Sequence, residues 1–307
     1  HLVNFYLSYI SWYYYMKNNL SNIKKAIKYL NKNHCIGIPT ETVYGLAANA
    51  YSTYATGKIF KLKRRPQRNP LIVHYYDLKL LKKDCEINSH FLKLYKKYSP
   101  GPISYILKLK HDSLISKNVT NKKNTVAVRF PSHPITRSLL KKLSFPLAAP
   151  SANISTKISP VSKKDVQDEF GKKISLILDG GRSKIGIEST IINLINKPQI
   201  LRLGGIQKEE IKRYLKLNVK FNKNSKIKSP GQEKIHYSPY IKLRLNIKIA
   251  DKNEAFILIK KRKKTSKDYY YLSKKKDLKE AAKNLYKVLR NIKNKDYKRI
   301  AAEKIPN

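Results

Sequence analysis

Apolar residues recur along this chain in two periods. A spacing of three to four residues, as in Ile23, Ala26 and Leu30, predicts the buried face of a helix. Short apolar runs such as Leu71–Tyr75 predict buried strands. Further helices are predicted at residues 52–62, 89–98, 134–143, 162–170 and 207–215, and further strands at 35–39, 104–109, 126–129, 147–149, 175–178, 190–194 and 199–203. This mixture of helices and strands predicts an α/β or α+β domain over residues 16–215.

The periodicity disappears over residues 216–240, which are polar and contain the breaker pair Pro230–Gly231. We interpret this stretch as a linker. Beyond it, the pattern predicts a second, small α/β domain over residues 241–307. Its predicted elements are two strands and a strongly amphipathic helix, at Ala255–Ile259, Arg299–Glu303 and Asp277–Ile292.

Residues 1–15 are apolar and aromatic, but they are too few to span a bilayer. They also lack the basic start and the small-residue cleavage site of a signal peptide. The single methionine, Met16, follows directly. We expect translation to start at Met16, the leader to stand outside the fold, and the protein not to associate with membranes.

Charge is the most unusual feature of the composition. Lys and Arg number 66 against 20 Asp and Glu, a net charge of +46 in 307 residues. Clustered cations favour binding to nucleic acids. However, lysines dominate the cations, and Asn, Ile and Tyr, which share A/T-rich codons with Lys, are also abundant. Because phosphate and base recognition relies more on Arg, the composition favours mutational bias spread over solvated faces.

Some classes of site are disfavoured by the motifs that are missing. The two cysteines, Cys35 and Cys85, form no CxxC pair, so neither a disulfide framework nor a zinc site is expected. Free cysteines are typical of a reducing, cytoplasmic setting. The sequence contains no Walker A loop and no GxGxxG motif, which argues against ordinary P-loop and Rossmann nucleotide sites. No cluster with metal-ligand spacing is evident.

Two segments carry side chains suited to a polar ligand. Residues 39–46 (PTETVYGL) place hydroxyls and a carboxylate after a predicted strand, a pattern typical of a small-ligand site or of a turn rich in capping residues. Residues 61–68 contain five cations between a helix and a buried strand. A triphosphate needs a cationic loop of this kind, because each phosphate oxygen accepts charge-assisted hydrogen bonds.

Two predicted strands end on residues that suggest chemistry. His74 ends one strand, where a histidine is either a ligand contact or a satisfied core residue. Arg129 ends another, where it either clamps a carboxylate or forms a structural salt bridge. Small polar clusters follow at Ala148–Asn153 and Gly186–Thr190.

Taken together, these motifs resemble one family. PTETVYGLAANA, KLKRRPQRNPLIVH, SPGPISYIL, TVAVRFPSHP, PLAAPSANIS, GIESTIINL and ILRLGG occur in the order and spacing of the YrdC/Sua5 family, over residues 20–215. SPGQEKIHYSPY resembles the linker of its longer, two-domain form, and AAKNLYKVLRNI and RIAAE resemble the small C-terminal domain of that form. That domain usually continues further, so we expect this C-terminal end to be cut short.

The resemblance implies both a fold and a reaction. The expected fold is a twisted mixed sheet flanked by helices, with a small C-terminal α/β domain. The family comprises L-threonylcarbamoyladenylate synthases, which convert L-threonine, bicarbonate and ATP, with Mg²⁺ on the phosphates, into threonylcarbamoyl-AMP and pyrophosphate. A partner transferase then modifies adenosine 37 of tRNA. The alternatives are a non-catalytic tRNA or double-stranded RNA binder and the related carbamoyl-transfer domain of hydrogenase maturation proteins, and a weak tRNA contact is compatible with the synthase interpretation.

The resemblance also assigns residues, motif by motif. The family's catalytic tetrad matches Lys63, Arg65, Ser151 and Asn153. The ATP contacts match Arg65, Asn69, Thr125, Ser151, Ser159, Arg202 and a linker residue, His236 or Tyr237. The threonine pocket matches Thr42, His74, Arg129, Ala149 and Ser189.

Overall fold

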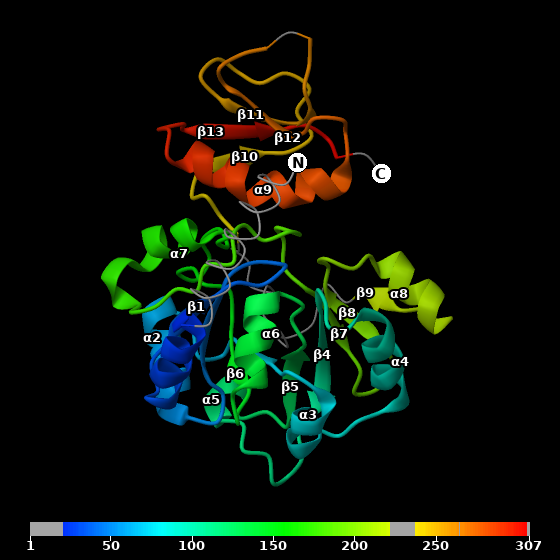
Figure 1. The fold of residues 1–307 in the computed structure, drawn as a ribbon. Coiled ribbons are helices and arrows are strands. Elements are labelled where there is room, and N and C mark those ends of the chain that lie inside the picture. The colour runs from blue at the N-terminus through cyan, green and yellow to red at the C-terminus, as the bar shows by residue number, and fades with distance from the viewer. Residues whose placement is uncertain (1–20, 222–236, 264, 306–307) are drawn as a thin grey trace, which may run out of the picture.

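The computed structural model describes residues 21–221, 237–263 and 265–305, which form two units (Figure 1). The larger unit extends to Phe221, and the smaller one stands on one side of it (Figure 1). The expected leader and most of the predicted linker lie outside the described residues. Within the described residues, no helix is long and apolar enough to cross a membrane.

The larger unit is built on one mixed sheet of nine strands, in the order β1-β2-β6-β3-β5-β4-β7-β8-β9. The pairs from β1 to β3 are antiparallel; from β3 onward, parallel pairs (β3 with β5, β4 with β7, β8 with β9) alternate with antiparallel ones. The strands are β1 Ile36–Ile38, β2 Gly45–Asn49, β3 Ile72–His74, β4 Ile103–Lys108, β5 Thr125–Arg129, β6 Leu147–Ala148, β7 Thr190–Asn193, β8 Gln199–Arg202 and β9 Lys220–Phe221.

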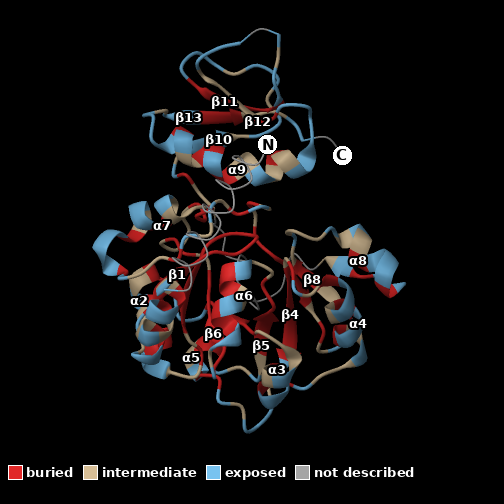
Figure 2. Ribbon diagram, in the orientation of Figure 1, coloured by how far each residue is buried: buried red, intermediate tan, exposed pale blue. Residues whose placement is uncertain are grey.

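Helices cover both faces of this sheet, because neighbouring residues of each strand point to opposite sides. On one face, Leu46 and Val73 pack in a cluster with apolar residues of α2, α4, α5, α7 and α8. On the other, Ala47 packs with α6 and with the helix that includes residues 21–31. Figure 2 shows buried strands between helices whose outer faces are exposed. The helices are α2 Thr53–Lys63, α3 Leu78–Asp84, α4 Ser89–Tyr98, α5 Lys117–Thr120, α6 Pro134–Lys141, α7 Lys163–Phe170 and α8 Lys208–Leu215, with a short 3-10 turn at Gly171–Lys173.

The smaller unit is a parallel sheet of four strands covered by one long helix. The strand order is β10-β13-β11-β12. The helix, α9, begins after Asp277, whose carboxylate accepts hydrogen bonds from the backbone N–H groups of Lys279 and Glu280 and so caps it. The elements are β10 Lys242–Arg244, β11 Ala255–Lys260, β12 Tyr269–Ser273, α9 Leu278–Lys293 and β13 Arg299–Ala302.

The predicted mixed α/β architecture is confirmed, with differences in detail. The prediction of a strand at residues 175–178 is wrong. In this segment only Ile177 forms an isolated β-bridge, with Gly37. The stretch interpreted as a linker contributes β9 to the large sheet before it leaves the described residues. The sequence pattern missed the short or weakly apolar elements β2, α3, α5, β10 and β12.

The two units are in contact through α9, which faces the large sheet unit (Figure 1). Val43 and Ile158 of the larger unit belong to the same apolar cluster as the core of the smaller one. At Gly186 the two backbones approach closely, since a Cβ there would lie 2.5 Å from the carbonyl oxygen of Lys283 in α9. A side chain at position 186 would therefore push the units apart.

We expect the smaller unit to depend on Ile292, which is fully buried between α9 and its sheet. Ile292→Ala should lower the free energy of unfolding of this unit by about 2–5 kcal/mol, because it removes buried methylenes and leaves a cavity. Leu278→Ala, in the same helix but 47% exposed, is the matched control, with an expected loss below about 0.5 kcal/mol. Urea denaturation measures both. Equal losses would contradict this assignment of the core.

Candidate functional site

One pocket lies at the edge of the large sheet where several strands end or begin. Strands β3 and β5 are parallel, so their last residues, His74 and Arg129, are neighbours in register. Strand β4 is antiparallel to β5 and parallel to β7, and β8 returns antiparallel to β7. This order brings Ser189, just before β7, and Arg202, at the end of β8, to the same edge. The strand order therefore gathers four polar side chains that are far apart in the sequence.

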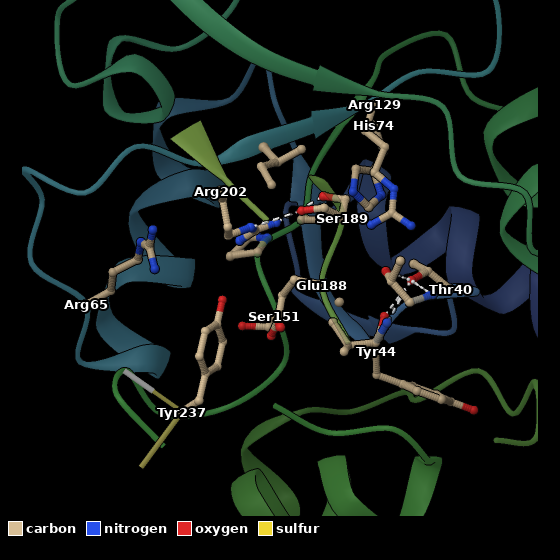
Figure 3. A pocket seen from close by; sticks show the side chains of 16 residues that line it. Thr40, Tyr44, Arg65, His74, Arg129, Ser151, Glu188, Ser189, Arg202 and Tyr237 are labelled. Atoms are coloured by element: carbon tan, nitrogen blue, oxygen red, sulfur yellow. Dashed lines mark hydrogen bonds between the residues drawn. The ribbon is translucent and has the colours of Figure 1, made fainter. Parts of the chain in front are cut away.

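The space between the lining residues is about 490 Å³, which includes open solvent at the mouth of the pocket. Figure 3 shows it with two sides. His74 and Arg129 stand on one side with Thr40, while Arg65 and Tyr237 stand on the other, with Arg202 and Glu188 between them. The lining residues are Thr40, Thr42, Val43, Tyr44, Gly45, Arg65, Ile72, His74, Arg129, Ala149, Pro150, Ser151, Glu188, Ser189, Arg202 and Tyr237.

Arg129 is held by a buried ion pair. Its Nη2 donates to Glu41 Oε1 at 2.7 Å, and its Nε donates to the carbonyl of Gly101 at 3.3 Å. The backbone N–H of Ser132 donates to the other Glu41 oxygen at 3.0 Å. Burial alone would raise the pKa of Glu41, but Arg129 and these hydrogen bonds hold it below its ordinary value. Glu41 therefore stays ionised and fixes the guanidinium at the pocket wall.

His74 stands beside Arg129 and is almost completely buried. Burial, together with the positive charge of Arg129, holds the pKa of His74 well below its ordinary value. The ring is therefore neutral at physiological pH. Its Nδ1 has no hydrogen-bond partner among the described residues. A buried nitrogen without a partner at a pocket wall is a group that a polar ligand can satisfy.

Hydroxyl groups complete this side of the pocket. Thr40 and Thr42 share a hydrogen bond of 2.9 Å between their Oγ1 atoms. Thr40 Oγ1 also donates to the carbonyl of Val43 and accepts from two backbone N–H groups, which folds residues 40–43 into a tight turn. The turn predicted for the PTETVYGL segment is confirmed, and the same hydroxyls also line the pocket.

The other side is cationic, and its charges are oriented by carbonyl groups. Arg65 donates from Nε to the carbonyl of Asn69 and from Nη2 to that of Pro70. Arg202 donates to the carbonyl and to the hydroxyl of Ser189, both at 3.0 Å. Carbonyls and hydroxyls orient a guanidinium without neutralising it, and these contacts hold both arginines at the pocket wall.

Lys63 lies beneath the pocket instead of lining it. Its Nζ donates to the carbonyls of Ser151 and Asn153, both at 2.5 Å. Burial, with the positive charge of Arg65, holds the pKa of Lys63 well below its ordinary value. In this structure Lys63 therefore acts on the site through the loop that it holds, at residues 151–153.

Nine of the fourteen predicted site residues that the structure describes line this one pocket, so the motif-based prediction located it. They are Thr42, Arg65, His74, Arg129, Ala149, Ser151, Ser189, Arg202 and Tyr237. The five that do not line it are Lys63, Asn69, Thr125, Asn153 and Ser159. His236, the alternative linker contact, lies outside the described residues.

Those five residues are placed differently from one another. Ser159 is buried behind the wall and donates to Glu188 at 2.5 Å. The side chains of Asn69 and Asn153 are buried in the loops that Arg65 and Lys63 hold, and each has an Oδ1 without a partner among the described residues. Thr125 begins β5, four residues before Arg129, and is away from the pocket.

The sequence analysis did not name Glu188 or Glu41 as site residues, although both lie inside the quoted motifs. Glu188 lines the pocket and accepts hydrogen bonds on both oxygens, from Ser159 and, at 2.5 Å, from Tyr286 of α9. Nothing in the sequence linked it to residue 286, which is 98 positions away. The buried partner of Arg129 could have been suspected, since Glu41 is a carboxylate in an otherwise apolar and hydroxyl-rich strand end.

Metal ligands are scarce among the described residues. They contain no group of three or more His, Cys, Asp or Glu side chains that could hold a metal ion. Among the described residues, Glu188 is the one carboxylate that lines the pocket, and hydroxyls already occupy both of its oxygens.

Comparisons with known proteins place the chain in a family. A family model described as "Telomere recombination" (Sua5_yciO_yrdC) matches residues 28–204. A second one, described as "Threonylcarbamoyl-AMP synthase, C-terminal domain", matches residues 206–307. The two matches meet between β8 and α8, so the second includes α8 and β9 of the large sheet unit as well as the smaller unit.

Similar proteins are known from bacteria and archaea. A threonylcarbamoyl-AMP synthase of Bacillus subtilis (strain 168) is 40% identical over 73% of this chain and 66% of the relative. One of Pyrococcus abyssi (strain GE5 / Orsay) is 38% identical over 71% of this chain and 65% of the relative. The matched stretches thus span slightly less than two thirds of these relatives.

Among solved structures, the fold is similar to that of Sua5 from P. abyssi, which was crystallised with L-threonine. The TM-score is 0.84 at 33% identity, over 92% of this chain and 88% of the other. A match over 92% of the chain extends beyond the large sheet unit into the smaller one. With the family model matching more than half of its residues, the chain belongs to the Sua5/YciO/YrdC family.

Proposed function

We propose that this protein is an L-threonylcarbamoyladenylate synthase, which converts L-threonine, bicarbonate and ATP into threonylcarbamoyl-AMP and pyrophosphate. The observation that carries the proposal is the two-sided pocket, with a carboxylate-binding side at Arg129 and a cationic side at Arg65 and Arg202. The names of the relatives and the threonine in the similar structure support the same activity.

On the first side, threonine would bind through one positively charged group, the guanidinium of Arg129, and through neutral groups beside it. Glu41 and Gly101 use the Nη2 and Nε donors of Arg129 and leave its Nη1 for the substrate carboxylate. The Nδ1 of the neutral His74 accepts a hydrogen bond from the hydroxyl or the amino group of threonine. The hydroxyl of Thr42 offers a further donor or acceptor at the same wall.

On the second side, the cations support the phosphoryl chemistry. The amine of threonine adds to the carbon of CO₂ and loses a proton, or it adds to bicarbonate with loss of water; either route forms an N-carboxylate. An oxygen of this carboxylate attacks the α-phosphorus of ATP, and the bond to the pyrophosphate leaving group breaks. Negative charge gathers on the transferring phosphoryl and leaving groups, where Arg65 and Arg202 stabilise it. Mg²⁺ on the ATP phosphates supplies further charge neutralisation when it is bound.

The proposal also covers the step that follows the reaction and the compartment in which it takes place. The product is a mixed anhydride that hydrolyses readily, so a transferase must accept the threonylcarbamoyl group soon after release, with N6 of adenosine 37 in tRNA as the final acceptor. A weak contact with tRNA is compatible with the cationic surface. We also propose a cytoplasmic location, which the free thiols Cys35 and Cys85 support.

One assay tests the proposal directly. The purified protein with ATP, ¹⁴C-bicarbonate and threonine should form a labelled adenylate and release pyrophosphate in equal amounts. Omission of threonine should abolish both products. A protein that binds RNA but forms no adenylate would instead support the non-catalytic alternative.

Loss of the Arg65 guanidinium should weaken ATP binding. Arg65→Ala removes a charge-assisted contact worth about 1.5–3 kcal/mol, so the KM for ATP should rise by at least about tenfold. Arg64→Ala is the matched control, because Arg64 is exposed in the same loop and does not line the pocket. Steady-state kinetics at varied ATP measures both. Equal KM values in Arg65→Ala and wild type would remove Arg65 from the site.

Replacement of Arg129 by lysine should affect threonine instead of ATP. Lysine retains the charge but loses the fork that contacts Glu41, Gly101 and the substrate at once. We expect the KM for threonine to rise about tenfold or more, with the Kd for ATP measured without threonine changing less than about twofold. Calorimetric titrations with each ligand separate the two effects. An equal loss of both affinities would indicate general damage to the sheet edge.

His74 should remain neutral at a pH where an ordinary histidine is half protonated. Because its folded-state pKa is lowered, the ring gains a proton only well below the usual midpoint of about 6.5. NMR of the ring nitrogens should therefore show no titration of His74 between pH 8 and pH 6. Threonine affinity should likewise show no step from His74 in this range. A midpoint near 6.5 for this ring would contradict its placement.

A further inference from the structure

Ser189 lies where the two sides of the pocket meet. It lines the pocket, and its hydroxyl accepts a hydrogen bond of 3.0 Å from Nη2 of Arg202. Figure 3 shows it between Arg202 and the side that carries His74 and Arg129. A group bound at this hydroxyl is therefore next to the binding places of both larger substrates.

A second buried hydroxyl lies behind Ser189. Ser104, in β4, is fully buried and does not line the pocket. Its Oγ is 2.8 Å from that of Ser189, and this is the one hydrogen bond of its side chain among the described residues. The sheet fixes Ser104 in this place, because it is in register with Arg129 of β5 and with Ile191 of β7.

The number of donors and acceptors gives these hydrogen bonds a direction. A serine hydroxyl has one proton to donate and two lone pairs that accept. Among the described residues, Ser189 is the one acceptor for the proton of Ser104, and a buried proton without an acceptor is costly. Ser104 therefore donates to Ser189, and Arg202 donates to the same oxygen. Both lone pairs of Ser189 are then occupied, and its own proton has no acceptor among the described residues.

Ser189 is thus a hydrogen-bond donor toward the pocket, and its ligand is an acceptor. The bond from Arg202 polarises the hydroxyl and strengthens this donor. An ammonium group has no lone pair for it, whereas a carboxylate oxygen has two. In the proposed reaction the carboxylate of threonine is at Arg129 and the phosphates are on the cationic side. The acceptor between them is the N-carboxylate, which joins the two substrates.

We propose that Ser189 binds an oxygen of the N-carboxylate formed from bicarbonate, and that Ser104 is the positioning residue that keeps Ser189 a donor. The inference rests on the proposed function, because it takes the intermediate from that reaction. Ser189 keeps its proton. It donates a hydrogen bond to the oxygen that does not attack the α-phosphorus and that becomes the carbonyl oxygen of the product. The motifs matched Ser189 to the threonine pocket, and the hydrogen-bond pattern narrows its role to the carboxyl group added to threonine.

Ser189→Ala tests the proposed contact, because it removes the donor. We expect the KM for bicarbonate, measured in CO₂-free buffer with saturating ATP and threonine, to rise about tenfold, the scale of one lost hydrogen bond to a charged group. The dissociation constants for threonine and for ATP, each measured by calorimetry without bicarbonate, should stay within twofold of wild type.

Ser104→Ala tests the positioning role, because it removes the hydroxyl behind Ser189 and leaves the lining of the pocket unchanged. The hydroxyl of Ser189 is then no longer fixed in direction. We expect the KM for bicarbonate to rise about three- to tenfold, the scale of one lost neutral hydrogen bond. Ser104→Thr keeps the hydroxyl and should stay close to wild type. In the Ser189→Ala background, Ser104→Ala should have no further effect.

Ser116→Ala is the matched control. Ser116 is also a buried serine, and its hydroxyl bonds to those of Thr53 and Thr56, away from the pocket. It should leave the KM for bicarbonate and both dissociation constants unchanged.

The possible outcomes are distinct. If wild type forms no adenylate, the proposed function fails and the inference fails with it. If wild type is active and Ser189→Ala keeps its KM for bicarbonate, only the inference is overturned. It is also overturned if Ser189→Ala weakens the binding of threonine or ATP in the absence of bicarbonate, because Ser189 would then contact that substrate itself. A Ser104→Thr variant as impaired as Ser104→Ala would remove the positioning role, since the hydroxyl would not matter.

Discussion

The buried ion pair between Arg129 and Glu41 is the interaction on which the pocket depends. It joins the end of β5 to the turn at residues 40–43, two segments that otherwise meet only at the sheet edge. Taking two charges out of water is costly, and two further hydrogen bonds help to offset this cost: Arg129 Nε donates to the carbonyl of Gly101, and the backbone N–H of Ser132 donates to Glu41. Removal of one partner from such a pair typically costs 3–5 kcal/mol, roughly, since the other charge stays buried. The site therefore has a rigid side on which a small substrate can be oriented.

The opposite side follows a different electrostatic principle. Arg65, Arg202 and Lys63 are all held by backbone carbonyls, with the addition of one hydroxyl. A carbonyl dipole orients a cation but leaves its net charge in place, whereas a carboxylate would cancel it. The pocket thus separates Arg129, whose charge a buried carboxylate neutralises, from Arg65 and Arg202, whose contacts with the described residues are to carbonyl and hydroxyl groups. This division of charge is more informative about the ligand than the overall +46 of the chain, most of which is lysine.

Most of the fold could be predicted from the sequence, and the elements that were predicted wrongly or missed have physical reasons. Helix α4 was predicted at its observed bounds because it is strongly amphipathic and Asn88 caps it. Strand β2 has the sequence Gly-Leu-Ala-Ala-Asn, which lacks β-branched residues, and it forms because β1 and β6 pair with it on both sides. Conversely, residues 175–178 (Ser-Leu-Ile-Leu) form a short apolar run like those of the observed strands, but only Ile177 forms a bridge, with Gly37. Pairing is a tertiary property that local periodicity does not contain.

The site was predicted to a similar extent, for a related reason. The motifs identified residues whose positions follow from the sequence next to them, such as His74 and Arg129, which end predicted strands. They could not tell Lys63, which holds a loop from beneath, from Arg65, which lines the pocket two positions later, because the direction of each side chain depends on the packing of the end of α2. They also gave no sign of Tyr286, since its partner is in the other unit.

The chemistry of that distant contact fits the division of charge in the pocket. Helix α9 is rich in lysine, yet a tyrosine meets Glu188. A lysine there would form an ion pair, and its length and flexibility would bring a mobile positive charge to the phosphate side. A tyrosine hydroxyl donates a hydrogen bond from a rigid ring and adds no charge at neutral pH, since burial and the nearby carboxylate raise its pKa well above the ordinary value. The second unit can therefore restrain the carboxylate while the electrostatics of the pocket remain those set by its own arginines.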